Sequence, residues 1–183
     1  MTRIVLIFGL ISGAIAGALM WLLVSVVKTE AIDFDNAVFV GYATMIIALS
    51  MVFFGIKSYR DNHGGQITFF KGLQIGLLIS LISAVCYAVS WEVYCRTGGA
   101  DEFMQKYTVY YLDKMKASGA SDAEIEKARV EGEEFIELYK NFFVRFAFSM
   151  MEILPVGIIV TIISAALLRR RDVLPHHPVE ATG

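Results

Sequence analysis

Long apolar runs without charge, separated by short polar segments, dominate the pattern of hydrophobic and polar positions along the chain. Four such runs cover residues 4–27, 37–56, 72–91 and 146–168. Only the last run is interrupted, by Glu152 and Pro155. A bilayer-crossing helix needs about 20 apolar residues, because its backbone must form all its hydrogen bonds internally. The pattern predicts an all-α integral membrane protein with four transmembrane helices.

The first run has one alternative interpretation, a cleaved signal peptide. Arg3 precedes an apolar stretch that contains small residues such as Ala14 and Ala16. We favour a retained span, because the run continues through Met20 to Leu23, beyond the ~7–15 apolar residues of a signal peptide.

The polar segment of residues 92–145 is too long for a structureless loop in so small a protein. Ser121 and Glu124 have the spacing of a capping box at the start of a helix. No proline occurs between this start and Pro155, so we expect that helix to continue unbroken into the fourth span. The segment predicts a helical hairpin between the third and fourth spans. We interpret its tyrosines as a belt at the membrane interface rather than a ligand site.

Lysine and arginine are distributed unevenly between the two sides of the predicted membrane domain. The side with both termini carries Arg3, Lys57, Arg60, Lys71 and Arg169 to Arg171. The short segment 28–36 on the other side has only Lys28. By the positive-inside rule, both termini are expected in the cytoplasm and the hairpin is expected to be extracytoplasmic. Residues 1–171 then form a single four-helix membrane domain, and 172–183 form a disordered cytoplasmic tail.

Composition narrows the possible classes of protein. Charged residues make up 19% of the chain, below the ~25% of soluble domains, and hydrophobic residues make up 56%. This excludes a disordered chain and a disulfide-stapled miniprotein, and it disfavours a soluble globule. With 16 basic and 18 acidic residues the net charge is −2, so we expect the lipid bilayer, and no nucleic acid, as a partner.

Small residues repeat every four positions in two of the predicted spans: Gly9, Gly13 and Gly17 in the first, and Gly72, Gly76, Ser80 and Ala84 in the third. Such ridges allow a neighbouring helix backbone to approach closely. They fit either homodimerisation or packing within the chain's own bundle, and we favour packing within the bundle.

Two ionisable residues lie in the predicted spans, and such residues are functional hypotheses by default. Lys71 opens the third span and is expected to reach the headgroups. Glu152 enters the fourth span from the hairpin side, where Arg145, Arg96 or Lys140 are its candidate partners. Together with the helix break at Pro155 it resembles a transporter's interrupted helix, although we favour a structural role.

The densest polar cluster is the loop after the second span, with Lys57, Tyr59, Arg60, Asp61, Gly64 and Gly65 as candidate functional residues. Arg60 either pairs with Asp61 or, with Lys57, holds lipid phosphates. Gly64 and Gly65 predict a turn with positive φ, and Thr68 predicts the cap of the next helix. The chain has no phosphate-binding loop and no catalytic or metal-binding motif, so we expect no enzymatic activity and no cofactor.

The segment GIKSYRD at residues 55–61, followed by GGQITF at 64–69 and GLQIGL at 72–77, resembles domain of unknown function family 4199. The similarity extends from the first span through Arg170. The resemblance implies a four-span protein of the bacterial inner membrane and implies no activity, cofactor or catalytic residue. Our leading hypothesis is a non-enzymatic structural or partner-binding membrane component, which includes homo-oligomers. The alternative is a small transporter or permeation subunit that uses Glu152 and Pro155.

Overall fold

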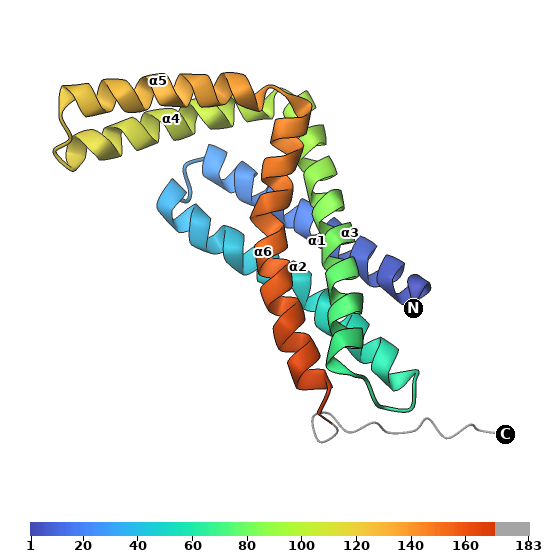
Figure 1. Cartoon of the computed structure of the whole chain (residues 1–183). Helices are drawn as coiled ribbons and strands as arrows, with labels where there is room; N and C mark the ends of the chain where they lie inside the picture. The colour runs from blue at the N-terminus through green and yellow to red at the C-terminus, as the bar shows by residue number, and fades with distance from the viewer. Residues whose placement is uncertain (171–183) are drawn as a thin grey trace.

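The computed structural model describes residues 1–170, and these residues form six α-helices and no β-strand (Figure 1). The helices are α1 (Thr2–Lys28), α2 (Phe34–Asp61), α3 (Phe69–Arg96), α4 (Gly99–Ala117), α5 (Asp122–Tyr139) and α6 (Phe142–Leu168). Helices α1, α2, α3 and α6 are long and apolar enough to cross a membrane. The predicted all-helical fold with four membrane-length helices is therefore confirmed. Arg171 and the predicted tail, 172–183, lie outside the described residues.

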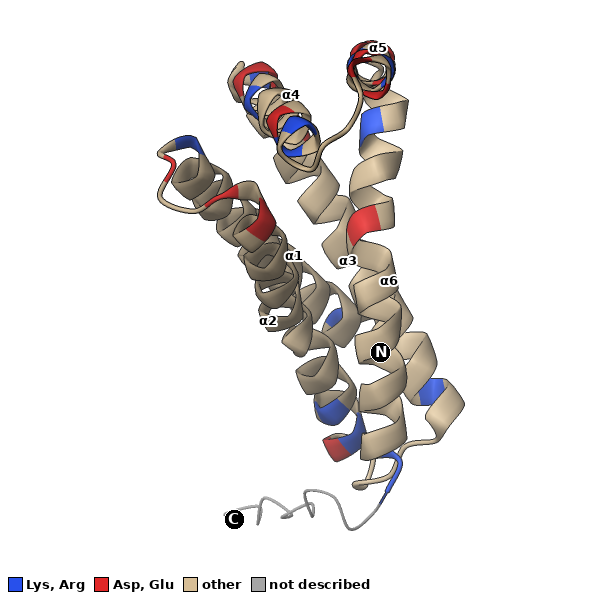
Figure 2. Cartoon of the chain, turned by 90° about the vertical axis from the view of Figure 1, so that its left-hand side faces the viewer, with Lys and Arg blue, Asp and Glu red and all other residues tan. Residues whose placement is uncertain are grey.

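The four long helices form two antiparallel pairs, α1 with α2 and α3 with α6 (Figure 2). The pairs pack tightly at the end remote from α4 and α5, where Val52, Ile56, Ile75 and Ile79 are fully buried. Toward the other end the α1–α2 pair diverges from the α3–α6 pair. Helices α4 and α5 form a hairpin that extends sideways across that end (Figure 1). The bundle therefore has one packed end and one end where the pairs separate.

The helix ends follow the local signals in the sequence. Gly64 and Gly65 both have φ of +73°, which confirms the predicted turn after α2. The side chain of Thr68 accepts a hydrogen bond from the backbone N–H of Lys71 and so caps α3. Ser121 and Glu124 form the predicted capping box at the start of α5.

The expectation that α5 continues unbroken into the fourth span is wrong. Helix α5 ends at Tyr139, and α6 begins at Phe142 in a different direction (Figure 1). Asn141 caps the new helix by accepting a hydrogen bond from the N–H of Phe143 at 2.9 Å. The break lets the aromatic residues of α5 fold back onto α6, where the ring of Phe135 lies 5.4 Å from that of Phe148. A continuous helix would carry those rings away from the bundle.

The small-residue ridge of α1 faces α3. An added Cβ at Gly9, Gly13 or Gly17 would meet side-chain atoms of α3 at 2.8, 2.3 and 2.6 Å, namely those of Ile82, Cys86 and Ser90. Ser12, beside this ridge, donates a hydrogen bond to the carbonyl of Ala48 on α2 at 2.9 Å. The close approach of α1 thus depends on residues without a Cβ.

The ridge of α3 faces α6. An added Cβ would lie 3.1 Å from Ala165 at Gly72 and 2.5 Å from Thr161 at Gly76. The hydroxyl of Ser80 donates to the carbonyl of Gly157 at 3.3 Å, and Ala84 is fully buried. Both ridges are therefore covered inside the chain's own bundle, which leaves neither of them open for contact with a second copy.

Candidate functional site

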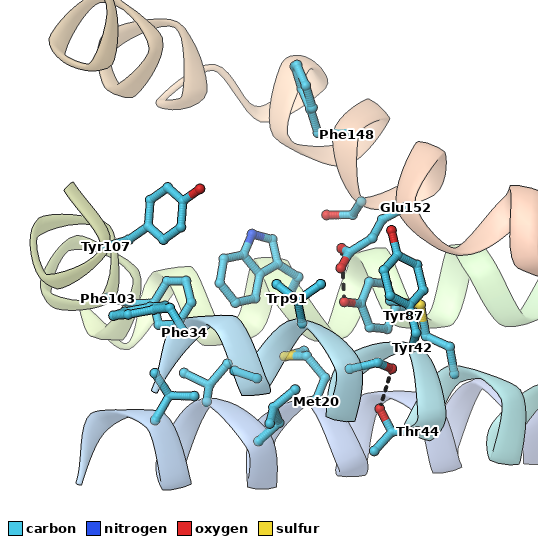
Figure 3. Close-up of a pocket in the computed structure, with 18 of the residues that line it drawn as sticks. Met20, Phe34, Tyr42, Thr44, Tyr87, Trp91, Phe103, Tyr107, Phe148 and Glu152 are labelled. Carbon is cyan, nitrogen blue, oxygen red and sulfur yellow. Dashed lines mark hydrogen bonds between the residues drawn. The ribbon is translucent and has the colours of Figure 1, made fainter. Parts of the chain in front are cut away.

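A pocket of about 550 Å³ lies where the helix pairs diverge, and residues of all six helices line it (Figure 3). The facing sides of the α1–α2 and α3–α6 pairs form its walls, while α4 and α5 contribute side chains where they cross the end of the bundle. Sites for small molecules commonly enclose 300–1,000 Å³. This pocket is the candidate functional site.

Apolar and aromatic side chains make up most of the lining. The lining positions of α1 and α2 recur at helical spacing, so they share one face of each helix. They are 20, 24 and 27 on α1 and 34, 38, 41 and 45 on α2. The aromatic residues of the lining are Phe34, Tyr42, Tyr87, Trp91, Phe103, Tyr107, Phe135, Tyr139 and Phe148. Met20, Met45 and Met104 add flexible side chains. Such a wall suits an apolar ligand of variable shape.

Glu152 is the one charged residue in this lining. It projects from α6 into the pocket, and its Oε2 accepts a hydrogen bond from the hydroxyl of Tyr87 on α3 at 3.1 Å (Figure 3). Within the described residues, Oε1 accepts no hydrogen bond. Glu152 is exposed and lines the pocket. The site therefore combines an apolar wall with one acidic group that has unused hydrogen-bonding capacity.

Hydroxyl and indole groups of the wall form contacts within the wall itself. The indole N–H of Trp91 donates to the hydroxyl oxygen of Tyr139 at 2.9 Å. Burial raises the pKa of the Tyr139 hydroxyl to about 12, so this group stays neutral near pH 7. Thr44 donates to the carbonyl of Gly41 at 2.7 Å, and Ser149 donates to that of Arg145 at 3.1 Å. These bonds hold the wall in shape.

Side-chain contacts join the tip of the α1–α2 hairpin to α4 at the end of the pocket. We call this set of contacts the tip–α4 link. It comprises Lys28–Glu102 at 2.5 Å, Lys114–Asp35 at 2.6 Å and the bond from Lys106 to the carbonyl of Lys28 at 2.9 Å. The ring of Phe34 lies 5.1–5.5 Å from the rings of Phe103, Tyr107 and Tyr110. The link closes the pocket at this end without extensive backbone packing.

Charge pairing in the tip–α4 link changes the ionisation of its groups. The hydrogen bond from Lys28 lowers the pKa of the Glu102 carboxyl. The hydrogen bond to Asp35 raises the pKa of Lys114, and the neighbouring Asp35 raises that of the Tyr110 hydroxyl. Near pH 7 the link therefore keeps Glu102 ionised and Lys114 protonated.

Arg145 forms the polar joint between α3, α5 and α6. Its guanidinium donates to both carboxylate oxygens of Glu92 on α3, at 2.5 and 2.7 Å. It also donates to the carbonyls of Tyr139 and Lys140 at 3.0 and 3.2 Å, where α5 ends. Arg145 thus does not contact Glu152. The basic partner expected for Glu152 is replaced by Tyr87, because Glu92 lies nearer to the guanidinium at the end of α3.

The polar loop residues lie at the opposite end of the bundle from the pocket. The Lys57 ammonium lies 2.6 Å and the Arg60 Nε 3.1 Å from the Asp61 carboxylate, so Arg60 and Asp61 pair as one alternative expected. Arg60 is only 1% exposed, which does not favour contact with lipid phosphates. Lys71 lies 5.8 Å from the ring centroid of Tyr59. The structure does not bring this cluster together with Glu152 and Pro155, which lie on α6 within one turn of each other.

Sequence reasoning missed Tyr87, Trp91 and the pair Glu92–Arg145. The pair had a detectable signal, because the two opposite charges stand at the adjoining ends of the third and fourth spans. Tyr87 and Trp91 are four residues apart and so share a helix face, but nothing in that spacing indicates a cavity. The pocket itself depends on the angle between the helix pairs, which no local pattern encodes.

Comparison with known families adds a match over almost the whole chain. The family described as "Protein of unknown function (DUF4199)" matches residues 7–170. The chain belongs to the DUF4199 family. The match spans all six helices, so the pocket lies within the DUF4199 region. No significant match was found among curated proteins or among solved structures.

Proposed function

We propose that this DUF4199 protein is a non-enzymatic membrane protein that binds a small lipophilic molecule in the pocket lined by all six helices. The observation that carries the proposal is the pocket of about 550 Å³, with its apolar and aromatic wall and a single accessible carboxylate. Binding sites for small molecules typically combine such a wall with a few placed polar groups. A molecule dissolved in the bilayer would reach the pocket between the diverging helix pairs.

The packing of the four long helices agrees better with ligand binding than with a permeation path through the bundle. A permeation path would have to continue from the pocket to the other end of the bundle. That end is filled by fully buried side chains, including Leu49, Val52, Ile56, Ile75 and Ile79. The transporter alternative keeps one support, because Glu152 lines the pocket. The expected helix break is absent: α6 continues through Pro155, which only leaves the carbonyl of Met151 without its usual N–H partner. The transporter alternative predicts a proton or solute flux in liposomes that Glu152→Gln abolishes.

A role based on assembly has less support. The small-residue ridges do not support it, because they pack inside the bundle against α3 and α6. The α4–α5 hairpin remains as a surface for a protein partner, with Val130 and Leu138 exposed on α5. Loss of a co-purifying protein on deletion of residues 101–137 would favour that role over ligand binding.

The binding proposal is tested by quenching of Trp91, which lines the pocket. The chain has two tryptophans, so Trp21→Phe leaves Trp91 as the only one. A dibrominated dodecanol, added to this variant in phosphatidylcholine nanodiscs, is expected to quench Trp91 saturably. In the same background Gly41→Phe fills the pocket and is expected to abolish the saturable part, whereas Ile47→Phe, on the exposed face of α2, is expected to leave it unchanged. Quenching that stays linear in every variant would overturn the proposal.

We also propose that the α4–α5 hairpin lies outside the cytoplasm of a bacterium whose inner membrane holds the protein. Lys57 near the end of α2, Lys71 at the start of α3 and Arg169 after the end of α6 stand at the helix ends away from the hairpin, as the positive-inside rule requires of the cytoplasmic side. In a variant with both native cysteines replaced, a membrane-impermeant maleimide is expected to label Ser118→Cys in intact cells. Asn62→Cys is expected to react only after permeabilisation, and the reverse result would invert the topology.

A further inference from the structure

We infer that the ligand of the pocket is a cationic amphiphile, an amine joined to a compact apolar body, whose ammonium group binds Glu152. This inference rests on the proposed binding function and adds the chemical class of the ligand. It starts from the charge of the pocket: Glu152 is acidic, and no lysine or arginine of the described residues lines the wall with it.

Most basic residues near the hairpin end have other partners, and Arg96, exposed at the end of α3, does not line the pocket. Arg145 binds Glu92, Lys28 binds Glu102, and Lys114 binds Asp35. Lys140 binds Glu137 at 2.5 Å, and Lys106 donates to a backbone carbonyl. The described part of the chain thus leaves the acidic group of the pocket without a cation of its own.

An ionised carboxylate among apolar groups is costly unless a counter-charge or several hydrogen bonds stabilise it. Glu152 has one hydrogen bond, from Tyr87 to Oε2, and Oε1 is open toward the pocket. A ligand ammonium has three N–H donors and forms charge-assisted bonds, which are about twice as strong as neutral ones. The missing partner of Glu152 is therefore supplied best by an amine.

The aromatic wall around Glu152 suits the same ligand. Tyr87 donates a hydrogen bond to the carboxylate, and Tyr42 and Trp91 line the same pocket (Figure 3). Ring faces attract cations, with Trp the strongest of the three residue types. Farther along the pocket, Met20, Val24 and Phe34 offer an apolar surface for the body of the ligand. The polar and apolar ends of an amphiphile thus each have a matching region.

Two sources of an amine have to be distinguished, a free amphiphile and the headgroup of an aminophospholipid. The headgroup carries a phosphate next to the ammonium. With no lysine or arginine in the described lining, the pocket has no counter-charge for that phosphate. The geometry therefore favours a free amine over phosphatidylethanolamine.

The experiment compares dibrominated dodecylamine with dibrominated dodecanol as quenchers of Trp91, in the Trp21→Phe background and in phosphatidylcholine nanodiscs. The amine is expected to bind about tenfold more tightly than the alcohol, the difference between a charged and a neutral hydrogen bond. Glu152→Gln keeps the side-chain shape and is expected to bring the two quenchers to equal affinity. Tyr87→Phe, which removes only the hydroxyl, is expected to retain the preference for the amine.

The outcomes separate this inference from the binding proposal. If the alcohol binds saturably and the amine binds no better, or if Glu152→Gln leaves the preference intact, the pocket binds ligands but the amine assignment is wrong. If neither quencher saturates, the binding proposal itself fails. Addition of phosphatidylethanolamine to the nanodiscs is expected to leave the affinity for the amine unchanged. Competition by that lipid would overturn the assignment to a free amine.

Discussion

Replacing Gly13 by alanine tests the packing of α1 on α3 at its closest point. The added Cβ would lie 2.3 Å from the Cβ and 3.0 Å from the Sγ of Cys86. Carbon atoms in contact normally stand about 3.5–4.0 Å apart, so the helices would have to separate by more than about 1 Å. The Cβ of Cys86 is fixed to its backbone, and a change of rotamer cannot move it away.

The expected size of the effect combines two opposing contributions. Overpacking a well-packed core costs about 1–3 kcal/mol. Alanine in a helix interior stabilises the helix by about 0.5–1 kcal/mol relative to glycine, which offsets part of that cost. We expect Gly13→Ala to lower the free energy of unfolding by about 1–2 kcal/mol.

The assay is reversible unfolding in mixed micelles with an increasing fraction of sodium dodecyl sulfate, followed by circular dichroism. Gly41→Ala is the matched control, because its added Cβ would meet nothing nearer than Leu23 at 3.5 Å. We expect that control to raise the free energy of unfolding by about 0.5–1 kcal/mol, which is the helix gain of alanine over glycine without a clash.

The double variant Gly13→Ala with Cys86→Gly moves the Cβ from one helix to the other. It should be more stable than the sum of the single changes predicts, by a coupling energy of about 0.5–3 kcal/mol. Additive effects, or a Gly13→Ala variant as stable as the unaltered chain, would refute the close approach of α1 and α3.

Three further predictions concern the polar joints. Arg145→Met should cost about 3 kcal/mol of unfolding free energy, because it leaves Glu92, whose side chain is 8% exposed, without its partner; adding Glu92→Gln should recover part of that loss. Since Lys28 lowers the pKa of Glu102, the tip–α4 link should be fully formed above the unfolded carboxyl pKa, about 4.3, and weaken as pH falls through the lower folded value. Spin-label distances between α1 and α4 would then broaden only at acid pH. Glu102→Gln should reduce that pH dependence, and the Lys114–Asp35 pair, in which Lys114 lowers the pKa of the Asp35 carboxyl, should account for what remains. Ser121→Ala should cost about 1 kcal/mol and speed hydrogen exchange in the first turn of α5, while unchanged exchange would contradict the role of the cap.

The helices were predictable because their signals are local. Each uncharged run of about 20 residues must form its own backbone hydrogen bonds in lipid, so run length alone predicts a span. The capping box at Ser121 and the turn at Gly64 and Gly65 depend on neighbouring residues, and both were predictable for that reason. The break after Tyr139 was missed, because the sequence lacks a proline there and Asn141 is only a weak signal by itself.

The candidate site was predictable only in part. Glu152 was singled out because a charge within an apolar run is conspicuous. Its partner was not, because Tyr87 is 65 residues away and reaches it only through the packing of α3 on α6. The polar cluster after α2 was equally conspicuous in the sequence, yet it lies at the other end of the bundle.

The amino-acid sequence by itself determined that the protein is helical, that four of its helices match a bilayer, and where most of those helices end. These properties follow from the composition and spacing of residues within one segment. The tertiary structure decided that the small-residue ridges face inward, that Arg145 binds Glu92, and that the helix pairs diverge around a pocket with Glu152 in its wall. Those features depend on crossing angles between helices, and the angles arise from side-chain packing between segments far apart in the chain.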